Sequence, residues 1–486
     1  MRGTGVWEGV ERQGLRRRSQ RMERAQPGQR PDPSRPAGTD RLPQIKHIVV
    51  LMMENHSFDN YLGTLGRGEG FPLGADGQPA VTNPDSSGDP VQPYHVPSTV
   101  QQAGVPCQSW WAAHAQFADG KMNGFVTATE QQAPTADKTV AMGYWTATDL
   151  PFYQGLASAF PVADRWFSSC LGPTFPNRRF LLAATANGLM DDLAVNILDY
   201  PPAGTILDML TKYGKSWVNY RPDGGDQSQF RRYWHYRRRR TGHHVRVLGT
   251  PFKRIRSGIK RDLQCTASLY PLGMAKYMLH IRGIDDFFAD AEAGNLPDFS
   301  IVDPDFAEYS EENPQDIRKG ESFAAEVINR VMHGKGWADT LLIWTYDEHG
   351  GYYDHIAPPP AEPPDDVKGR SLVAHSSWLR SILKPLFPAY VKHAQDLVCE
   401  PLEYNTYGFR VPAVIVSPYA RRECVVSEVF DHTSVLKLLE EKWNLPALTR
   451  RDAAATAPLA ALDLESPPAF LKPPDLPAPS LTWGSW

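Results

Sequence analysis

Apolar runs alternate with helix-like patterns along most of the chain. Five runs predict strands: Ile48–Met53, Ser216–Tyr220, Asp298–Val302, Leu341–Tyr346 and Val411–Val416. Three stretches repeat apolar residues at helical spacing: Thr205–Tyr213, Glu321–Met332 and Thr433–Trp443. This alternation predicts an α/β fold, a three-layer α/β/α sandwich in which helices cover both faces of a mostly parallel sheet.

The chain divides into a central region and two ends of different composition. Residues 1–42 are rich in Arg, Gln, Gly and Pro, which predicts a disordered N-terminal tail. Residues 43–445 hold all the strand and helix patterns and predict one large domain, with insertions at about 231–261 and 357–406. Residues 446–486 are rich in Ala and Pro, and we expect them to wind over the surface or to fray.

Composition indicates a folded protein without an obvious polyanionic partner. Hydrophobic residues make up 41% and charged residues 22% of the 486 positions, and the net charge is −4. Five scattered cysteines, an odd number, argue against a complete disulfide framework. No apolar segment follows the basic Arg16–Arg18, so a signal peptide is not expected. We expect a cytoplasmic or peripheral location, with export left open if the start site is assigned wrongly. The oligomeric state is unknown from the sequence.

Two acidic clusters each follow a strand-like run. Glu54 and Asn55 come directly after the first run, and Asp347 and Glu348 come directly after the fourth. In an open parallel sheet, ligands bind beyond the carboxyl ends of the strands. Carboxylate and amide oxygens are the ligands that hard divalent cations prefer. The sequence therefore predicts that one divalent cation joins two segments almost 300 residues apart.

Four blocks of the chain, in order, share their pattern with one known family. They are Ile45–Gly63, then Asp164–Ser169 with Gly172–Arg178, then Tyr346–His355, then Val411–Tyr419 with Phe430–Val435. Together they resemble the bacterial phospholipase C and acid phosphatase family, which is similar to the plant non-specific phospholipases C. The resemblance runs from about residue 43 to 445. It implies an alkaline-phosphatase-like fold and the hydrolysis of phosphate esters.

The resemblance also implies a metal site and a nucleophile. The metal ligands map to Glu54, Asn55, Asp347 and Glu348, where one divalent ion (Ca, Mg, Mn or Zn) is expected. The nucleophile maps to Thr174, in a tight Gly-Pro-Thr-Phe-Pro loop. A cation would lower the pKa of this hydroxyl and direct it at phosphorus.

The segment before this loop resembles a strand. Phe160–Phe167 has a strand-like pattern, and Thr174 would follow it at the edge of the sheet. Ser168 and Ser169 are poor substitutes as nucleophiles because they lie outside the matching loop position.

Histidines are the expected acids for the leaving alkoxide. His114 precedes a Gly-Lys-Met-Asn-Gly-Phe stretch and matches a family block in which a His faces the phosphate. His355 follows Asp354 in the second acidic cluster and is the other candidate. Lys121 and His349, together with Asp354, are candidates for contacts with the substrate. The sequence does not decide which His is the acid.

One position departs from the family pattern. Relatives carry an Asp-His-Pro whose His contacts the substrate phosphate, whereas this chain has Asn313 at that place. Asparagine can donate a hydrogen bond to a phosphoryl oxygen but cannot shuttle a proton near neutral pH. Either another His supplies the proton, or the substrate preference has shifted.

The segment from Arg231 to Arg261 is strongly basic. It holds twelve Lys and Arg and no acidic residue, with Tyr233, Trp234 and Tyr236 among them. It is either a solvated loop, an interfacial patch for anionic membrane surfaces, or a nucleic-acid contact. We expect no nucleic-acid partner, and we expect peripheral membrane contact to be the functional alternative.

These observations predict a metal-dependent phosphoesterase. The expected activity is that of a phospholipase C that hydrolyses phosphatidylcholine-like glycerophospholipids to diacylglycerol and phosphorylated headgroup through a phosphothreonine. Two alternatives remain open. One is an acid phosphatase, a phosphomonoesterase on the same scaffold, because monoester and diester hydrolysis need nearly the same site. The other is a non-catalytic protein that binds anionic surfaces through the basic segment.

Overall fold

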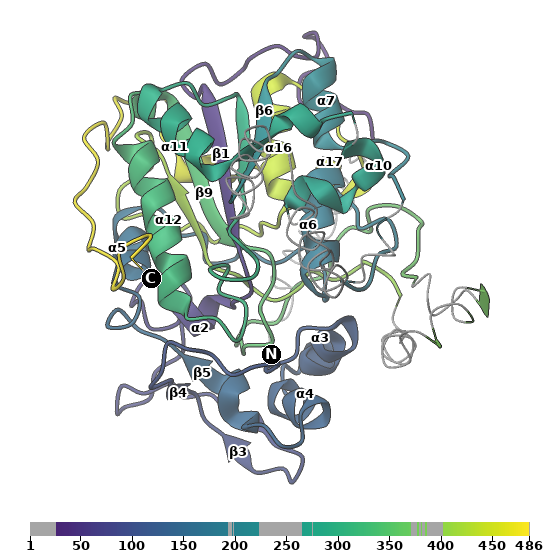
Figure 1. The fold of residues 1–486 in the computed structure, drawn as a ribbon, viewed down its shortest axis with the longest axis vertical. Coiled ribbons are helices and arrows are strands. Elements are labelled where there is room, and N and C mark those ends of the chain that lie inside the picture. Colours follow the sequence, from purple (N-terminus) through teal and green to yellow (C-terminus); the bar gives the residue numbers. More distant parts are fainter. Residues whose placement is uncertain are drawn as a thin grey trace, which may run out of the picture.

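A six-stranded sheet, in the order β10-β9-β1-β8-β6-β7, forms the centre of the protein (Figure 1). The computed structural model describes residues 26–485 except 193–196, 198, 223–264, 275 and most of 371–401. The strands are β1 (His47–Met53), β6 (Trp217–Arg221), β7 (Ile281–Gly283), β8 (Phe299–Val302), β9 (Thr340–Tyr346) and β10 (Ala413–Val416). All neighbours are parallel except β10, which runs antiparallel to β9. The mostly parallel sheet is confirmed, and its fifth predicted strand is an antiparallel edge.

Helices cover both faces of the sheet, which confirms the predicted α/β/α arrangement. Figure 1 shows α5, α11 and α12 on one side and α6, α7 and α16 on the other. Their bounds are α5 (Pro151–Ala159), α6 (Thr174–Ala183), α7 (Ile206–Lys212), α11 (Ile284–Ala293), α12 (Ile317–Met332) and α16 (Thr433–Trp443). The three predicted helices correspond to α7, α12 and α16.

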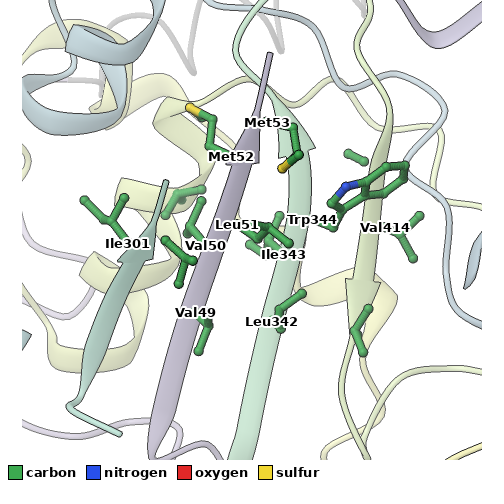
Figure 2. Packing of buried hydrophobic residues seen from close by; sticks show 14 of the residues in the cluster. Val49, Val50, Leu51, Met52, Met53, Ile301, Leu342, Ile343, Trp344 and Val414 are labelled. Carbon is green, nitrogen blue, oxygen red and sulfur yellow. The ribbon is translucent and has the colours of Figure 1, made fainter. Parts of the chain in front are cut away.

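The middle strands are buried on both faces, which explains their continuous apolar sequences. Every residue of β9 is buried, and so is every residue of β1 after His47. Side chains of β1, β8, β9 and β10 pack against one another in the core (Figure 2). The register pairs Met53 with Tyr346, so β1 and β9 end side by side. The residues that follow these two strands are therefore neighbours in space.

Local signals begin and end the helices as the sequence suggests. Thr205 and Asp208 form a capping box at the start of α7. The Asp316 side chain accepts a hydrogen bond from the Arg318 N–H at the start of α12. Gly294 ends α11 with a φ of 73°, a left-handed conformation that favours glycine.

A smaller layer lies beyond the end of the sheet that carries the carboxyl ends of β1 and β9 (Figure 1). It holds two helices, α3 (Trp110–Phe117) and α4 (Phe125–Gln132). It also holds two small sheets of two short strands each, one of β2 (Asn83–Pro84) and β3 (Pro90–Val91) and one of β4 (Tyr94–His95) and β5 (Gly143–Tyr144). Close above it, α2 (Phe58–Leu62) follows β1.

Two expectations about segments do not hold. The predicted tail is not free from residue 26 onward, since Asn444 at the end of α16 hydrogen-bonds the Asp32 backbone and Lys442 pairs with Asp40. Residues 160–167 form isolated bridges to Val414, Val425, Phe430 and Arg410 rather than a strand.

The C-terminal segment is partly integrated into the fold. The short helix α17 (Arg450–Ala454) carries Arg451, which is fully buried, and Phe470 is buried against the core. The insertion at 231–261 and most of 371–401 lie outside the described residues. No helix that the structure describes is long and apolar enough to cross a membrane.

Candidate active site

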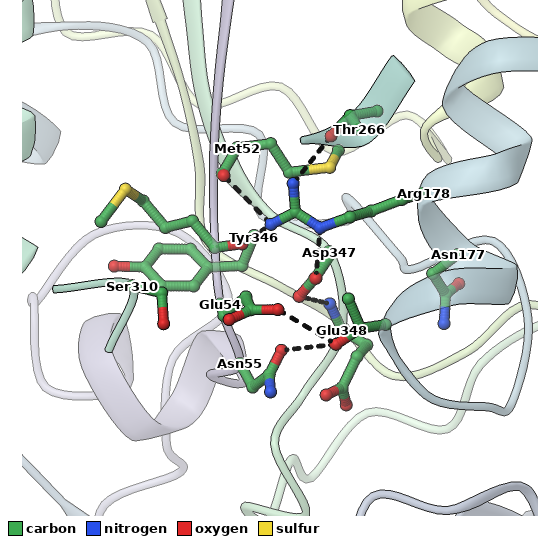
Figure 3. A network of polar contacts seen from close by, with 12 residues as sticks. Met52, Glu54, Asn55, Asn177, Arg178, Thr266, Ser310, Tyr346, Asp347 and Glu348 are labelled. Carbon is green, nitrogen blue, oxygen red and sulfur yellow. Dashed lines mark hydrogen bonds and ion pairs between the residues drawn. The ribbon is translucent and has the colours of Figure 1, made fainter. Parts of the chain in front are cut away.

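The carboxyl ends of β1 and β9 bring the two acidic clusters together. Glu54 and Asn55 are each 3% exposed, and Asp347 and Glu348 are fully buried. Figure 3 shows all four side chains in one polar network, with Glu54 and Asn55 on the β1 side. Parallel pairing of the strands makes this meeting possible, because both chains leave the sheet at the same edge.

Thr174 is the first residue of α6 and faces the β1 end of this network. Its Oγ1 lies 3.2 Å from Asn55 Oδ1 and 3.4 Å from Glu54 Oε1. Thr174 as a whole is 6% exposed, and the one proton of its hydroxyl faces two acceptors. Pro173 stands at the N-cap in an extended conformation, which turns the chain from the loop into the helix. The structure thus brings the predicted nucleophile to two of the predicted metal ligands.

Arg178, one turn after Thr174 on α6, is a central residue that the sequence analysis did not single out. Its Nε donates to Asp347 Oδ2 at 2.7 Å and its Nη1 donates to Asp303 Oδ1 at 2.8 Å. Its Nη2 donates to the carbonyls of Met52 and Met53 at the end of β1 (Figure 3). This buried guanidinium therefore joins the ends of three neighbouring strands.

Asp303 could have been found by the same signal as the other acids. It follows β8 directly, as Glu54 follows β1 and Asp347 follows β9. Its carboxylate is fully buried and also accepts hydrogen bonds from Thr266 Oγ1 and Asn219 Nδ2. Asp303 is thus occupied by donors and is the second carboxylate that pairs with Arg178.

The remaining carboxylates are held at an electrostatic cost. Burial raises the pKa of Glu54 well above its usual value, and the charges of Glu312 and Asp347 add to this effect. Burial and the charge of Asp347 likewise raise the pKa of Glu348. Burial also raises the pKa of Asp347, although Arg178 opposes it. One guanidinium does not balance this many buried acids.

Unpartnered atoms show that the site fits a cation. At this site, Glu54 Oε2 and Glu348 Oε1 are buried and have no hydrogen-bond partner among the described residues. A buried carboxylate oxygen without a donor is unfavourable unless a cation meets it. The donor set is made of carboxylate and amide oxygens, which suits hard divalent ions. The residues present therefore fit the divalent ion that the sequence predicted.

His349 lies on the far side of Glu348. Its Nδ1 is 3.1 Å from Glu348 Oε2, and its Nε2 is 2.8 Å from Gln116 Oε1. Burial lowers its pKa to about 3, so the ring is neutral at ordinary pH. Gln116 on α3 also donates to the Cys107 carbonyl. The smaller layer therefore supports the Glu348 side of the site.

His114 lies on the same helix, near the nucleophile loop. Its Nδ1 donates to the Trp110 carbonyl at 2.8 Å, which leaves Nε2 as the nitrogen free of the proton in the neutral ring. Its ring contacts Trp110, and Trp110 packs directly against Gly172, two residues before Thr174. Burial lowers the pKa of His114.

His355 and Asp354 belong to a separate cluster around Arg410. His355 Nδ1 is 2.6 Å from Asp59 Oδ2, and Arg410 donates to both Asp59 Oδ1 and Asp354 Oδ1. Burial alone would lower the pKa of His355, but the hydrogen bond and charge of Asp59 outweigh it and raise the pKa.

The same three side chains resemble a metal site by distance alone. One ligand atom each from Asp59, Asp354 and His355 lie within 4.8 Å of one another. However, one guanidinium already pairs with both carboxylates, and Asp59 Oδ2 also accepts the His355 N–H. We interpret this cluster as an ion-pair network that orients His355.

Two predicted substrate contacts lie at the periphery. Asn313 is half-buried and follows Glu312, whose charge acts on Glu54. Lys121 is exposed at the turn after α3, and no contact in the described part of the chain joins it to the acidic residues. The roles assigned to both residues stay predictions.

Comparison with known proteins identifies the family. The family model described as "Phosphoesterase family" matches residues 45–446. Phospholipase C B of Mycobacterium tuberculosis is 27% identical over 469 residues, which cover 89% of this chain and 80% of that protein. Non-specific phospholipase C1 of Arabidopsis thaliana is 28% identical over 85% of this chain and 69% of its own length. Hemolytic phospholipase C of Pseudomonas aeruginosa is 28% identical over 84% of this chain and 54% of its own length.

Solved structures give a weaker similarity. A protein in the alkaline phosphatase superfamily from Vibrio parahaemolyticus aligns with 91% of this chain and 78% of its own, with a TM-score of 0.36 and 11% identity.

The match over most of the chain defines the class of protein, a phosphoric ester hydrolase. The chain belongs to the Phosphoesterase family.

Proposed function

We propose that the protein is a metal-dependent phospholipase C that hydrolyses phosphatidylcholine-like glycerophospholipids to diacylglycerol and the phosphorylated headgroup. The observation that carries the proposal is the position of Thr174 Oγ1 against Glu54 and Asn55. The phospholipases C among the relatives support the choice of a lipid phosphodiester as substrate. Glu54, Asn55, Asp347 and Glu348 would hold the ion.

The chain's own residues account for two steps of a double displacement. Thr174 Oγ1 gives up its proton to water and attacks phosphorus as the bond to the diacylglycerol oxygen breaks, and a histidine donates a proton to that oxygen. Water then cleaves the phosphothreonine, which releases the phosphorylated headgroup and restores the hydroxyl. When bound, the ion supplies positive charge that lowers the pKa of the hydroxyl and offsets the charge of the phosphoryl oxygens.

Two histidines can donate the proton. His114 packs near the nucleophile loop through Trp110, and Asp59 fixes the ring of His355 with its Nε2 free. A His with a raised pKa keeps its proton to higher pH, which suits a general acid. The raised pKa of His355 favours it over His114, whose pKa is lowered.

A pair of chromogenic substrates tests the proposal. A choline phosphodiester and a simple phosphate monoester are each incubated with the protein, with and without a chelator. We expect cleavage of the diester that the chelator abolishes and that added Mn²⁺ or Ca²⁺ restores. Cleavage of the monoester alone would identify an acid phosphatase instead. Cleavage of neither, with metal restored, would refute an esterase with this site.

A further inference from the structure

A buried carboxylate ringed by tyrosines lies behind the candidate metal site. Glu311 is fully buried. Its Oε2 accepts hydrogen bonds from Tyr61 at 2.9 Å and from Tyr346 at 2.5 Å, and its Oε1 accepts one from Tyr153 at 2.6 Å. Three hydroxyl donors thus converge on one side chain. Burial raises the pKa of Glu311 to about 8, although the three tyrosines oppose this shift.

The tyrosines belong to the elements that carry the site. Tyr346 is the last residue of β9 and directly precedes Asp347. Tyr61 is in α2, which follows β1 and the Glu54–Asn55 pair. Tyr153 is in α5 on the helical layer that covers this end of the sheet. One carboxylate therefore ties together both strand ends and a supporting helix.

The backbone at Glu311 is also tightly held. Its φ of 80° is a left-handed conformation that costs free energy in a residue other than glycine. Gln101 and His56 both donate to its carbonyl, at 2.5 and 3.1 Å. Its N–H donates to Gln315 Oε1 at 3.0 Å. The surrounding contacts hold a conformation that the local sequence does not favour.

The residues on either side of Glu311 in the chain, Ser310 and Glu312, both act on the candidate ligand Glu54. The Ser310 carbonyl accepts the Glu54 N–H at 3.0 Å, so the residue before Glu311 fixes the backbone of a candidate ligand. The residue after it is Glu312, whose charge acts on the Glu54 carboxylate. Asn313 follows. A shift of Glu311 would therefore move groups that surround Glu54.

Space around Glu311 leaves little room for such a shift. Gly320 on α12 packs so closely that an added Cβ there would overlap the Glu311 side chain. The backbone of α12 thus packs directly against the Glu311 side chain, and only glycine at position 320 allows this close contact.

We propose that Glu311 is a positioning residue for the metal site, which acts through its tyrosine ring on the ends of β1 and β9 and on the Ser310–Asn313 turn. The proposal rests on the proposed function, because it concerns how the ion is held. A purely structural role would affect folding stability alone. A positioning role also affects the affinity for the ion and the rate at saturating metal.

Titration of the full-length protein with Mn²⁺, followed by calorimetry, tests this. A carboxamide cannot accept three hydroxyl donors, so we expect Glu311→Gln to raise the Kd for Mn²⁺ by about 10-fold or more, as loss of an outer-shell partner does elsewhere. The kcat for the choline phosphodiester at saturating Mn²⁺ should fall as well. Tyr153→Phe removes one hydroxyl and should raise the Kd about threefold, and it carries the test if Glu311→Gln does not fold.

Glu440→Gln is the matched control. Glu440 is an equally buried carboxylate on α16 with a raised pKa and a Lys437 partner, but it is not joined to the metal site. Its Mn²⁺ affinity and kcat should stay within about twofold of the wild type, whatever its thermal stability. Equal Kd and kcat in the Glu311, Tyr153 and Glu440 variants would overturn the proposal. If the wild type neither binds Mn²⁺ nor turns over the diester, it is the proposed function that fails.

Discussion

Two buried arginines organise carboxylates at the same end of the sheet, yet their surroundings differ. Arg178 contacts Asp347 and Asp303, and next to it Glu54 and Glu348 each keep an oxygen without a hydrogen-bond donor. Arg410 contacts Asp59 and Asp354, and neither acid retains an unpartnered buried oxygen. The two clusters have similar composition but opposite degrees of hydrogen-bond satisfaction.

The difference separates a binding site from a scaffold. A satisfied buried ion pair holds neighbouring segments in place and gains nothing from a further cation. Unsatisfied buried carboxylates destabilise the empty fold, and a bound cation relieves that cost. Proximity of acids is therefore a poorer guide to a metal site than proximity combined with buried acceptor oxygens that no donor meets. By that criterion we place the proposed metal site at Glu54 and Glu348, whereas the ion pairs around Asp59 orient the ring of His355.

The largest expected effect is at the proposed nucleophile, Thr174, which contacts Glu54 and Asn55 on the Arg178 side. Thr174→Ala should lower kcat for the choline phosphodiester by roughly 10⁴-fold, because no other hydroxyl takes its place. Thr174→Ser keeps the hydroxyl and should retain measurable turnover. Steady-state kinetics with circular dichroism as a folding check measures this. Near-normal turnover by Thr174→Ala would show that the nucleophile is another group.

A smaller effect, on stability, is expected on the Arg410 side. Asp59→Asn leaves a buried guanidinium with one anionic partner fewer and should lower the free energy of unfolding by about 3 kcal/mol. Urea denaturation measures the change. Glu403→Gln breaks the exposed pair with Lys368 and should leave the midpoint unchanged. An Asp59 variant as stable as the wild type would remove the scaffold interpretation.

For Glu54, a proposed metal ligand on the Arg178 side, the expected change in the free energy of unfolding has the opposite sign. In protein treated with chelator at pH 8, Glu54→Gln should raise the free energy of unfolding by roughly 1–2 kcal/mol, because it removes a buried acid whose pKa is raised. The same variant should lose activity. Thermal unfolding without and with Mn²⁺ measures the change in stability, and hydrolysis of the choline phosphodiester measures the loss of activity. A lower free energy of unfolding for Glu54→Gln in the chelated protein would contradict the view that the Glu54 carboxylate destabilises the metal-free fold.

The pH dependence of stability gives a further test of the Arg410 cluster. Burial raises the pKa of Asp354 to about 6, although Arg410 opposes it. A raised pKa in the folded state means that this stabilisation is complete below the unfolded pKa, near 4, and is lost as the pH rises through about 6. Asp354→Asn should therefore flatten the stability profile between pH 4 and 6, by roughly 2 kcal/mol in total. Parallel profiles for the two proteins would contradict this assignment.

The sequence predicted the parts of the fold that local patterns determine. The ends of β1 and β9 could be found because a continuous apolar run predicts a buried strand, and the acids that follow it then lie at the sheet edge. The orientation of β10 could not be predicted, because an apolar run is the same in both directions. Residues 26–42 look disordered by composition but dock on α16 through backbone groups, which composition does not show.

The site was predictable where function follows a strand and unpredictable where it depends on packing. Arg178 becomes central only when β1, β8 and β9 are known to be neighbours. Glu311 contacts three tyrosines from distant segments, and no spacing pattern along the chain predicts that these tyrosines meet around one carboxylate. His432 is the N-cap residue of α16, but its ring bonds the Asp347 carbonyl and does not cap the helix, a contact that the local sequence does not show.

The central claim is that the unsatisfied cluster, and not the satisfied one, binds the cation. Calorimetric titration of Mn²⁺ into the wild type, Glu348→Gln and Asp354→Asn tests it most directly, with folding of each variant checked beforehand. The account predicts that Glu348→Gln weakens binding by about 10-fold or more, whereas Asp354→Asn stays within about threefold of the wild type. The reverse order, with binding lost in Asp354→Asn and kept in Glu348→Gln, would contradict it.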